Sequence, residues 1–138
     1  MRPFRRLAAD GRGSVAVEFA LFLPVFLLVI FSIIELGAAW YQKQMLVNAS
    51  REGARLGALF STSGGLTAQE VQERVNQYLS DSGFPSQAVV QAVGVDGASG
   101  DPVTVNVSAD YEFPVLSAFI GAVPGTISLS ATTVMRHE

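Results

Sequence analysis

The side chains able to do chemistry are few in this 138-residue sequence, and they are scattered along it. There is no cysteine, and the single histidine is His137. The acidic residues fall on expected strand faces and turns, so the pattern offers neither a nucleophile–base pair nor a metal-ligand cluster. We therefore predict that the protein is not an enzyme, holds no metal and needs no cofactor. His137 is expected to be a solvated tail residue.

One carboxylate is unusual because of its neighbours. Glu18 lies at the start of an apolar run in which, from Phe19 to Ile34, only Pro24 and Ser32 are not apolar. A carboxylate at membrane depth costs about 3 kcal/mol on insertion scales, so Glu18 is predicted to be functional. The alternative is a tolerated charge that snorkels to the nearby interface. Pro24 removes a backbone donor inside the run, which predicts a kink.

The apolar run predicts a membrane anchor. Residues 14–36 suffice to span a bilayer, since about 20 residues at 1.5 Å each cover the hydrocarbon core. Four arginines against one aspartate in residues 1–13 predict that this leader stays cytoplasmic and that the rest is extracytoplasmic, in a single-pass protein of the inner membrane. The net charge of −3 argues against a nucleic-acid partner. No strong helix breaker follows until Gly64, so the helix should continue to about residue 60, before a head of residues 61–138.

The head is predicted to combine one short helix with a small sheet. Thr67 and Glu70 have the spacing of a capping box, and Val71, Val75, Tyr78 and Leu79 form the stripe expected to be buried. The fold class is therefore α+β: a long N-terminal transmembrane helix, a second short helix and an antiparallel sheet of three to four strands.

The strands are indicated where the repeat of apolar residues changes from a helical spacing to every second residue. Apolar and polar residues alternate from Val103 to Phe113 and again from Ile127 to Met135, while residues 89–95 form a hairpin with the first of these runs. The segment 114–125 is bracketed by prolines and is expected to be a packed crossover loop or a short helix. Its apolar part, Val115 to Val123, should lie in the core, with a partner-facing patch as the alternative.

The N-terminal third of the sequence resembles a known family. A basic leader ends in Gly13, and Ser14-Val15-Ala16-Val17-Glu18-Phe19 then opens the apolar run, as in type IV prepilins. The strings Glu35-Leu36-Gly37 and Ala49-Ser50-Arg51-Glu52-Gly53-Ala54-Arg55 are similar to the TadE-like family, prepilin-like minor components of tight-adherence (Flp-type) pilus systems. The resemblance covers about residues 12–60. The chain departs from major Flp pilins, which are little more than the helix, by its added head.

The resemblance implies partners and site residues. A prepilin peptidase would cut between Gly13 and Ser14, and glycine suits a protease that grips an extended backbone. Glu18 would become the fifth mature residue and an assembly contact, with the new amine of Ser14 on a neighbouring subunit as counter-ion. The remaining partners would be other pilin-like subunits and the pilus assembly platform.

A second group of residues has a packing or docking interpretation. Ala49, Gly53 and Gly57 form a small-residue ridge that permits close backbone approach, either within the chain or between subunits. The charged residues beside this ridge form either a docking surface or an ordinary solvated helix face with an i, i+3 pair. These charged residues are Arg51, Glu52 and Arg55.

Three functional interpretations remain open on sequence alone. The first is a TadE-like minor pilin or pseudopilin with a structural role in pilus assembly or initiation. The second is an uncleaved single-pass anchor whose head binds another envelope protein. The third, a domain released by signal peptidase near Gly37-Ala38-Ala39, is weaker because the apolar run is longer than a signal-peptide core. The mature N-terminus discriminates between them.

Overall fold

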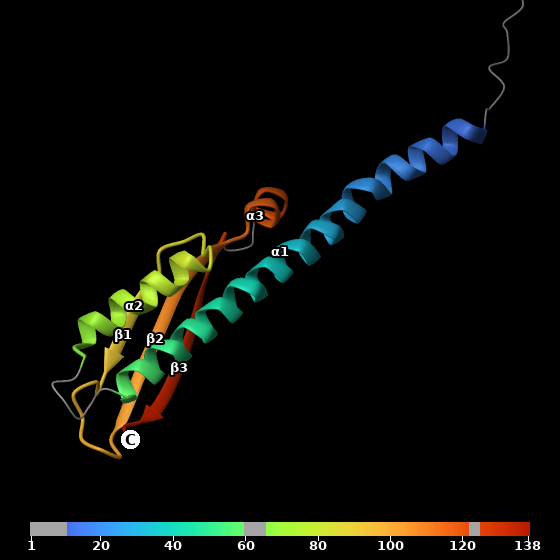
Figure 1. The fold of residues 1–138 in the computed structure, drawn as a ribbon. Coiled ribbons are helices and arrows are strands. Elements are labelled where there is room, and N and C mark those ends of the chain that lie inside the picture. The colour runs from blue at the N-terminus through green and yellow to red at the C-terminus, as the bar shows by residue number, and fades with distance from the viewer. Residues whose placement is uncertain (1–10, 60–65, 122–124) are drawn as a thin grey trace, which may run out of the picture.

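The computed structural model describes residues 11–59, 66–121 and 125–138, and it has the predicted α+β class. Figure 1 shows the arrangement: a long helix runs past a small sheet, and a second helix lies beside it. Residues 1–10 of the predicted leader, the predicted helix end near residue 60 and the predicted helix breaker at Gly64 lie outside the described residues. The elements in chain order are α1 (Gly11–Leu59), α2 (Ala68–Asp81), β1 (Val89–Val93), β2 (Pro102–Glu112), α3 (Pro114–Ile120) and β3 (Thr126–Arg136).

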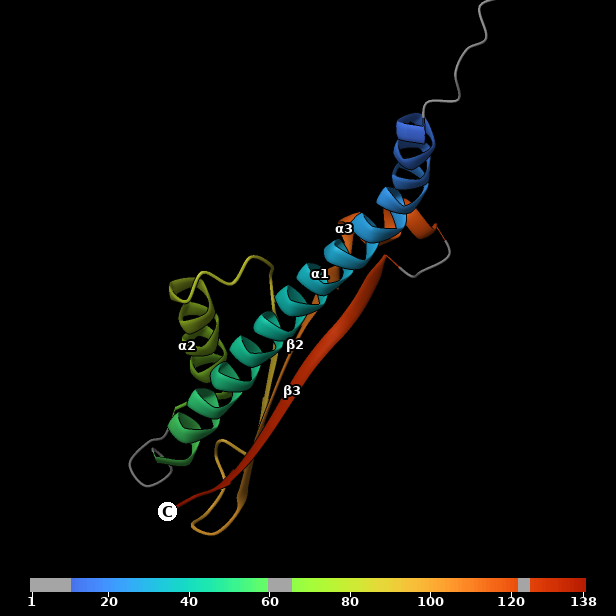
Figure 2. The same ribbon diagram turned by 90° about the vertical axis from the view of Figure 1, so that its right-hand side faces the viewer.

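The long helix α1 is uninterrupted over 49 residues, including Pro24. Its C-terminal part packs on the sheet and on α2, whereas its N-terminal part extends away from the head (Figure 1). Seen from the side, the N-terminal, blue part runs in a different direction from the rest of the helix (Figure 2). A proline inside a helix removes one hydrogen bond and crowds the preceding turn, so Pro24 stays our predicted cause of a kink in this part.

The sheet has three antiparallel strands in the order β1-β2-β3. The predicted hairpin is present: β1 pairs with β2 so that Val90 lies opposite Val107. In the other pair, Val107 lies opposite Ala131. The alternation of β2 places its valines on the face covered by α1 and α2, as a half-buried strand requires.

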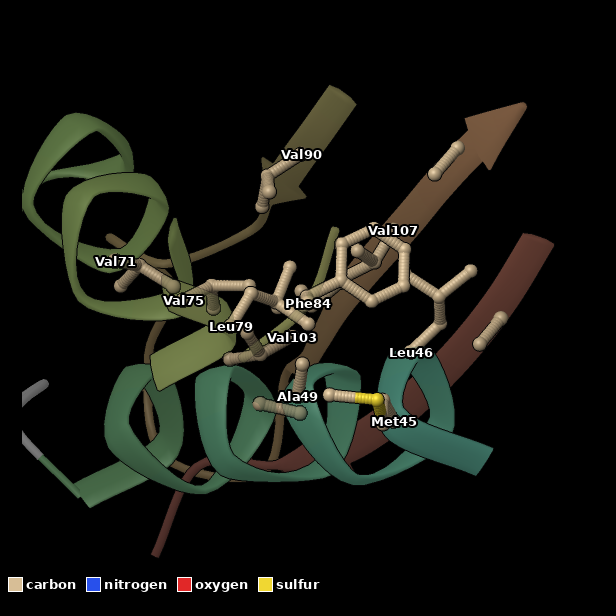
Figure 3. Close-up of a cluster of buried hydrophobic side chains, with 14 of the residues drawn as sticks. Met45, Leu46, Ala49, Val71, Val75, Leu79, Phe84, Val90, Val103 and Val107 are labelled. Carbon is tan, nitrogen blue, oxygen red and sulfur yellow. The ribbon is translucent and has the colours of Figure 1, made fainter. Parts of the chain in front are cut away.

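The core lies between this face of the sheet and the two helices. Figure 3 shows that side chains from α1, α2, β1 and β2 converge there, with the ring of Phe84 among them. Polar contacts also join α1 to β3: the Ser50 hydroxyl lies 2.8 Å from Thr133 Oγ1, and the Lys43 ammonium donates to the Ser130 carbonyl. The C-terminal part of α1 is therefore an integral part of the head.

The predicted capping box of α2 is confirmed. The Thr67 hydroxyl accepts from the Glu70 N–H at 3.3 Å, and the Thr67 N–H donates to the Glu70 carboxylate at 2.7 Å. The predicted buried stripe is correct at Val71, Val75 and Leu79. It is wrong at Tyr78, which is 36% exposed because it lies at the edge of the stripe.

The prediction for His137 is wrong. The residue is 3% exposed because the end of β3 pairs with the connection between β1 and β2. The His137 N–H donates to the Asp101 carbonyl, its own carbonyl accepts from Gly100, and its Nε2 lies 2.7 Å from the Gly94 carbonyl oxygen. Gly94 has a φ of 78°, and an added Cβ there would lie 2.4 Å from the Pro102 carbonyl oxygen. Glycine is therefore required for this turn.

Candidate functional site

The N-terminal part of α1 presents an apolar surface to its surroundings. Within the described chain, this is the one helix that is long and apolar enough to cross a membrane, and its most apolar window has no buried residue. Large side chains point outward on every side of it, among them Val17, Phe22 and Ile33, each more than 60% exposed. A helix that is apolar all round requires a non-aqueous environment or partners around it.

Glu18 lies on this apolar surface, one helical turn after Ser14. Four residues at 1.5 Å each place the two about 6 Å apart along the axis. Glu18 is exposed, and among residues 11–59, 66–121 and 125–138 it has no hydrogen-bond or ion-pair partner. Gly13 is equally open, since an added Cβ there would meet nothing within 4 Å. The geometry leaves the Glu18 carboxylate accessible to another protein. The Gly13–Ser14 junction is uncovered but lies in the first turn of α1, which begins at Gly11, so an extended backbone there requires this turn to unwind.

The small-residue ridge packs against the chain's own head. Ala49 is fully buried. A Cβ added at Gly53 would lie 2.5 Å from Val75 Cγ2, and one added at Gly57 would lie 2.9 Å from Val103 Cγ1. The two glycines therefore let α1 approach α2 and β2 closely, which is the packing interpretation of the ridge.

The charged residues beside the ridge remain on the surface. Arg55 donates to both carboxylate oxygens of Glu52, at 3.1 and 2.9 Å, and so forms a bidentate i, i+3 pair. The hydrogen bond from Arg55 lowers the pKa of the Glu52 carboxyl below its usual value. Arg51 is exposed and makes no hydrogen bond or ion pair within the described residues. The geometry matches an ordinary helix face, and it leaves Arg51 available to a partner.

A further charged residue, Glu35, was indicated by the sequence only as part of the Glu35-Leu36-Gly37 string, and its structural role was not predicted. Glu35 lies at the end of the apolar run and is 6% exposed. Its Oε1 accepts from the Val115 N–H at 2.6 Å, and its Oε2 accepts from the Leu116 N–H at 3.1 Å. These are the first N–H groups of α3 because Pro114, which precedes them, has none. Glu35 thus satisfies the start of α3 from a different helix.

Tyr111 strengthens the same contact between α1 and the start of α3. Its hydroxyl donates to the Glu35 carbonyl oxygen at 3.0 Å, and its ring packs edge-on against Phe113 with centroids 4.9 Å apart. Burial, followed by the Glu35 charge, raises the pKa of the Tyr111 hydroxyl, so it stays protonated as a donor. The end of β2 and the start of α3 are both fixed to one turn of α1.

A signal for Glu35 was present in the sequence. The cost of a carboxylate at membrane depth, which singled out Glu18, applies equally to a glutamate that directly follows Ile34. What the sequence does not contain is the identity of its partners, which lie 80 positions away.

The expected burial of Val115 to Val123 is wrong where it can be tested. Val115 and Leu116 are half-buried, but Phe119 is 59% exposed. The cause is that α3 lies beyond the end of the sheet, so that only the side facing α1 is covered (Figures 1 and 2). Val123 lies outside the described residues.

A single apolar N-terminal helix that continues into an α+β head is consistent with a single-pass membrane protein. The model of the family described as TadE-like protein matches residues 13–55. This segment is similar to the TadE-like family, and the head lies outside the match. Searches of curated proteins and of solved structures returned no match.

This similarity points to a pilin-like protein associated with a tight-adherence pilus, with partners in that pilus system. Members are generally structural proteins. The matched segment contains the Gly13–Ser14 junction, Glu18, Pro24 and the charged neighbours of the ridge. Of the ridge itself it contains Ala49 and Gly53 and ends before Gly57.

Proposed function

We propose that this chain is a minor pilin or pseudopilin with a structural role in the assembly or initiation of a tight-adherence (Flp, type IV-like) pilus. A prepilin peptidase removes residues 1–13, and the mature helix stays in the inner membrane with the head outside the cytoplasm. The subunit then joins other pilin-like subunits on the assembly platform through that helix.

The observation that carries this proposal is the unpaired carboxylate of Glu18 on an all-apolar helix surface. Burying a charge without a partner costs roughly several kcal/mol of free energy, whereas a paired and hydrogen-bonded charge is tolerated. Between Ser14 and Leu36 the sequence has no lysine or arginine. Cleavage creates a cation at the right depth, because the free amine of Ser14 lies one turn away from Glu18 on the helix.

A neighbouring subunit provides that amine without strain. The amine of the same chain lies at the helix end, about 6 Å along the axis, and the carboxylate projects sideways from it. In a bundle of parallel subunits, a small axial shift between two helices places the amine of one beside Glu18 of the other. Each subunit then offers one donor and one acceptor, which suits a repeating assembly.

The orientation follows from charge. Arg2, Arg5, Arg6 and Arg12 precede the apolar run. Positive residues on the N-terminal side hold that side in the cytoplasm during insertion, so the head is translocated. This orientation places the Gly13–Ser14 junction at the cytoplasmic end of the span.

Processing is tested by coexpressing the full chain with a prepilin peptidase and measuring the intact mass of the membrane-extracted protein. We expect loss of residues 1–13, and we expect Gly13→Val to block that loss because the valine side chain obstructs the extended backbone. Gly11→Val is the matched control, with the same change two positions earlier in the leader, and it should be cut normally.

Two results would contradict the proposal in different ways. If active peptidase leaves the wild-type N-terminus intact, the protein is an uncleaved single-pass anchor, and the pilin interpretation fails. If Gly11→Val blocks cleavage and Gly13→Val does not, the peptidase recognises the chain but the assigned junction is wrong.

A further inference from the structure

Among the described residues of the head, the short helix α3 lies beside α1 at the end of its apolar part. In both views it lies beyond the end of the sheet, on the side of the head that faces the N-terminal part of α1 (Figures 1 and 2). Its start is fixed at the depth of Glu35 by the two hydrogen bonds to Val115 and Leu116. Glu35 directly follows the apolar run, so α3 begins where the predicted membrane span ends.

The chemistry of α3 matches that position. Between Glu112 and Arg136 the sequence contains no charged residue. On α3 itself Phe119 is 59% exposed and Ala118 is also exposed, so the side of the helix turned away from α1 is apolar. An exposed phenylalanine on a helix with no charge is unfavourable in water and favourable at the boundary of the acyl chains.

Two aromatic residues of α1 indicate the level of the interface. Trp40 and Tyr41 are 68% and 65% exposed and lie about one and a half turns beyond Glu35, toward the head. Exposed tryptophan and tyrosine next to an apolar span are typical of the lipid headgroup region. The membrane side of this level therefore includes Glu35 and the start of α3.

We propose that α3 is a membrane-contacting helix of the head, with Phe119 inserted among the lipids of the outer leaflet beside α1. Phe119 of α3 and the apolar residues of α1 are both exposed, α3 packs against α1, and one layer of lipid covers both. Glu35 is the residue that holds α3 in place, because its carboxylate accepts from the first N–H groups of α3 and needs no cation to do so. The head is then fixed in tilt and rotation against the membrane.

This proposal rests on the insertion of α1 in the membrane, which is part of the proposed function, and it is independent of cleavage and assembly. The absence of cysteine allows single labels to be placed freely. We would label Phe119→Cys with an environment-sensitive fluorophore in the full chain, reconstituted in phosphatidylcholine–phosphatidylglycerol vesicles. Nitroxide lipids report contact with acyl chains, and iodide reports contact with water.

Two matched positions calibrate the result. Val25→Cys lies on the apolar part of α1 and Val134→Cys on the open face of the sheet, and both side chains are about as exposed as Phe119. We expect quenching by nitroxide lipid at position 119 to be close to that at position 25 and several-fold above that at position 134, with the reverse order for iodide. Ala118→Cys repeats the measurement with the aromatic ring retained.

The other outcomes overturn the proposal. A label at position 119 that behaves like the one at 134 shows that α3 lies in water. A label shielded from both quenchers shows that protein covers α3 instead of lipid. If the label at position 25 is itself not quenched by nitroxide lipid, α1 is not inserted, and the membrane part of the proposed function fails together with this one.

Discussion

Replacing Gly53 by alanine should destabilise the head, although alanine is the better helix former. The added methyl group would lie 2.5 Å from Val75 Cγ2 and 3.2 Å from Val105 Cγ1. Val75 is 1% exposed, and its β-branched side chain has little rotamer freedom in a helix, so the methyl group cannot move aside without shifting α2. Gly37→Ala is the matched control on the same helix, because a Cβ there meets nothing within 4 Å.

The magnitude follows from comparing the two variants. Replacing a helical glycine by alanine stabilises by about 0.5–1 kcal/mol, and this gain is common to both. Overpacking a well-filled core costs about 1–3 kcal/mol, and this cost applies to Gly53→Ala alone. The free energy of unfolding should therefore be about 1–3 kcal/mol lower for Gly53→Ala than for Gly37→Ala.

The measurement is urea-dependent pulse proteolysis of the full chain in detergent, with the midpoint compared between wild type and the two variants. Adding Val75→Ala to Gly53→Ala removes the clashing methyl group, so the two changes should be coupled and the double variant should lose less than the sum of the single losses. Equal stability of Gly53→Ala and Gly37→Ala would refute the packing interpretation of the ridge.

Two further predictions concern Glu35, at the contact between α1 and α3, and Glu70, in the capping box of α2. Glu35→Ala leaves the N–H groups of Val115 and Leu116 without an acceptor and should lower the free energy of unfolding by about 1–3 kcal/mol. Glu35→Gln keeps one acceptor oxygen, so its loss should be smaller. Equal losses for the two variants in the same proteolysis assay would contradict this. The Glu70 carboxyl has a lowered pKa because the backbone N–H and the hydroxyl of Thr67 donate to it. Its contribution to stability is therefore fully present above the ordinary glutamate pKa of about 4.3 and is lost as the pH falls through the lowered folded-state pKa. In an NMR titration Thr67→Ala should raise the pKa of Glu70 only in part, because the backbone N–H of residue 67 still donates to the carboxylate. An unchanged value would show that the Thr67 hydroxyl does not contribute to the shift.

Local patterns in the sequence were sufficient for most of the fold. The capping box at Thr67 and Glu70 needs residues only three positions apart, and the alternation in β2 reports burial residue by residue. The hairpin of β1 and β2 followed from two apolar runs joined by a turn rich in glycine and aspartate. Each of these signals is local, because it depends on backbone geometry within one or two elements.

The features that could not be predicted depend on contacts between distant segments. Glu35 meets Val115 across 80 positions, and His137 is buried against Gly94 across 43. No spacing rule links such pairs, since their proximity depends on where the complete sheet places the ends of its strands. Phe119 was assigned to the core because apolar composition does not distinguish a core contact from an exposed apolar surface.

The assembly role of Glu18 is tested most directly by partner recovery from membranes. Wild type, Glu18→Ala and Glu18→Gln would be coexpressed with prepilin peptidase and the other pilin-like subunits, with Glu73→Gln, an exposed glutamate on α2, as the control. All four chains should be inserted and cut after Gly13. We expect Glu73→Gln to recover partners like wild type, and both Glu18 variants to lose them because the carboxylate that pairs with the Ser14 amine is gone. Recovery of partners by both Glu18 variants at the wild-type level would contradict the account, and Glu18 would then be a tolerated interfacial charge.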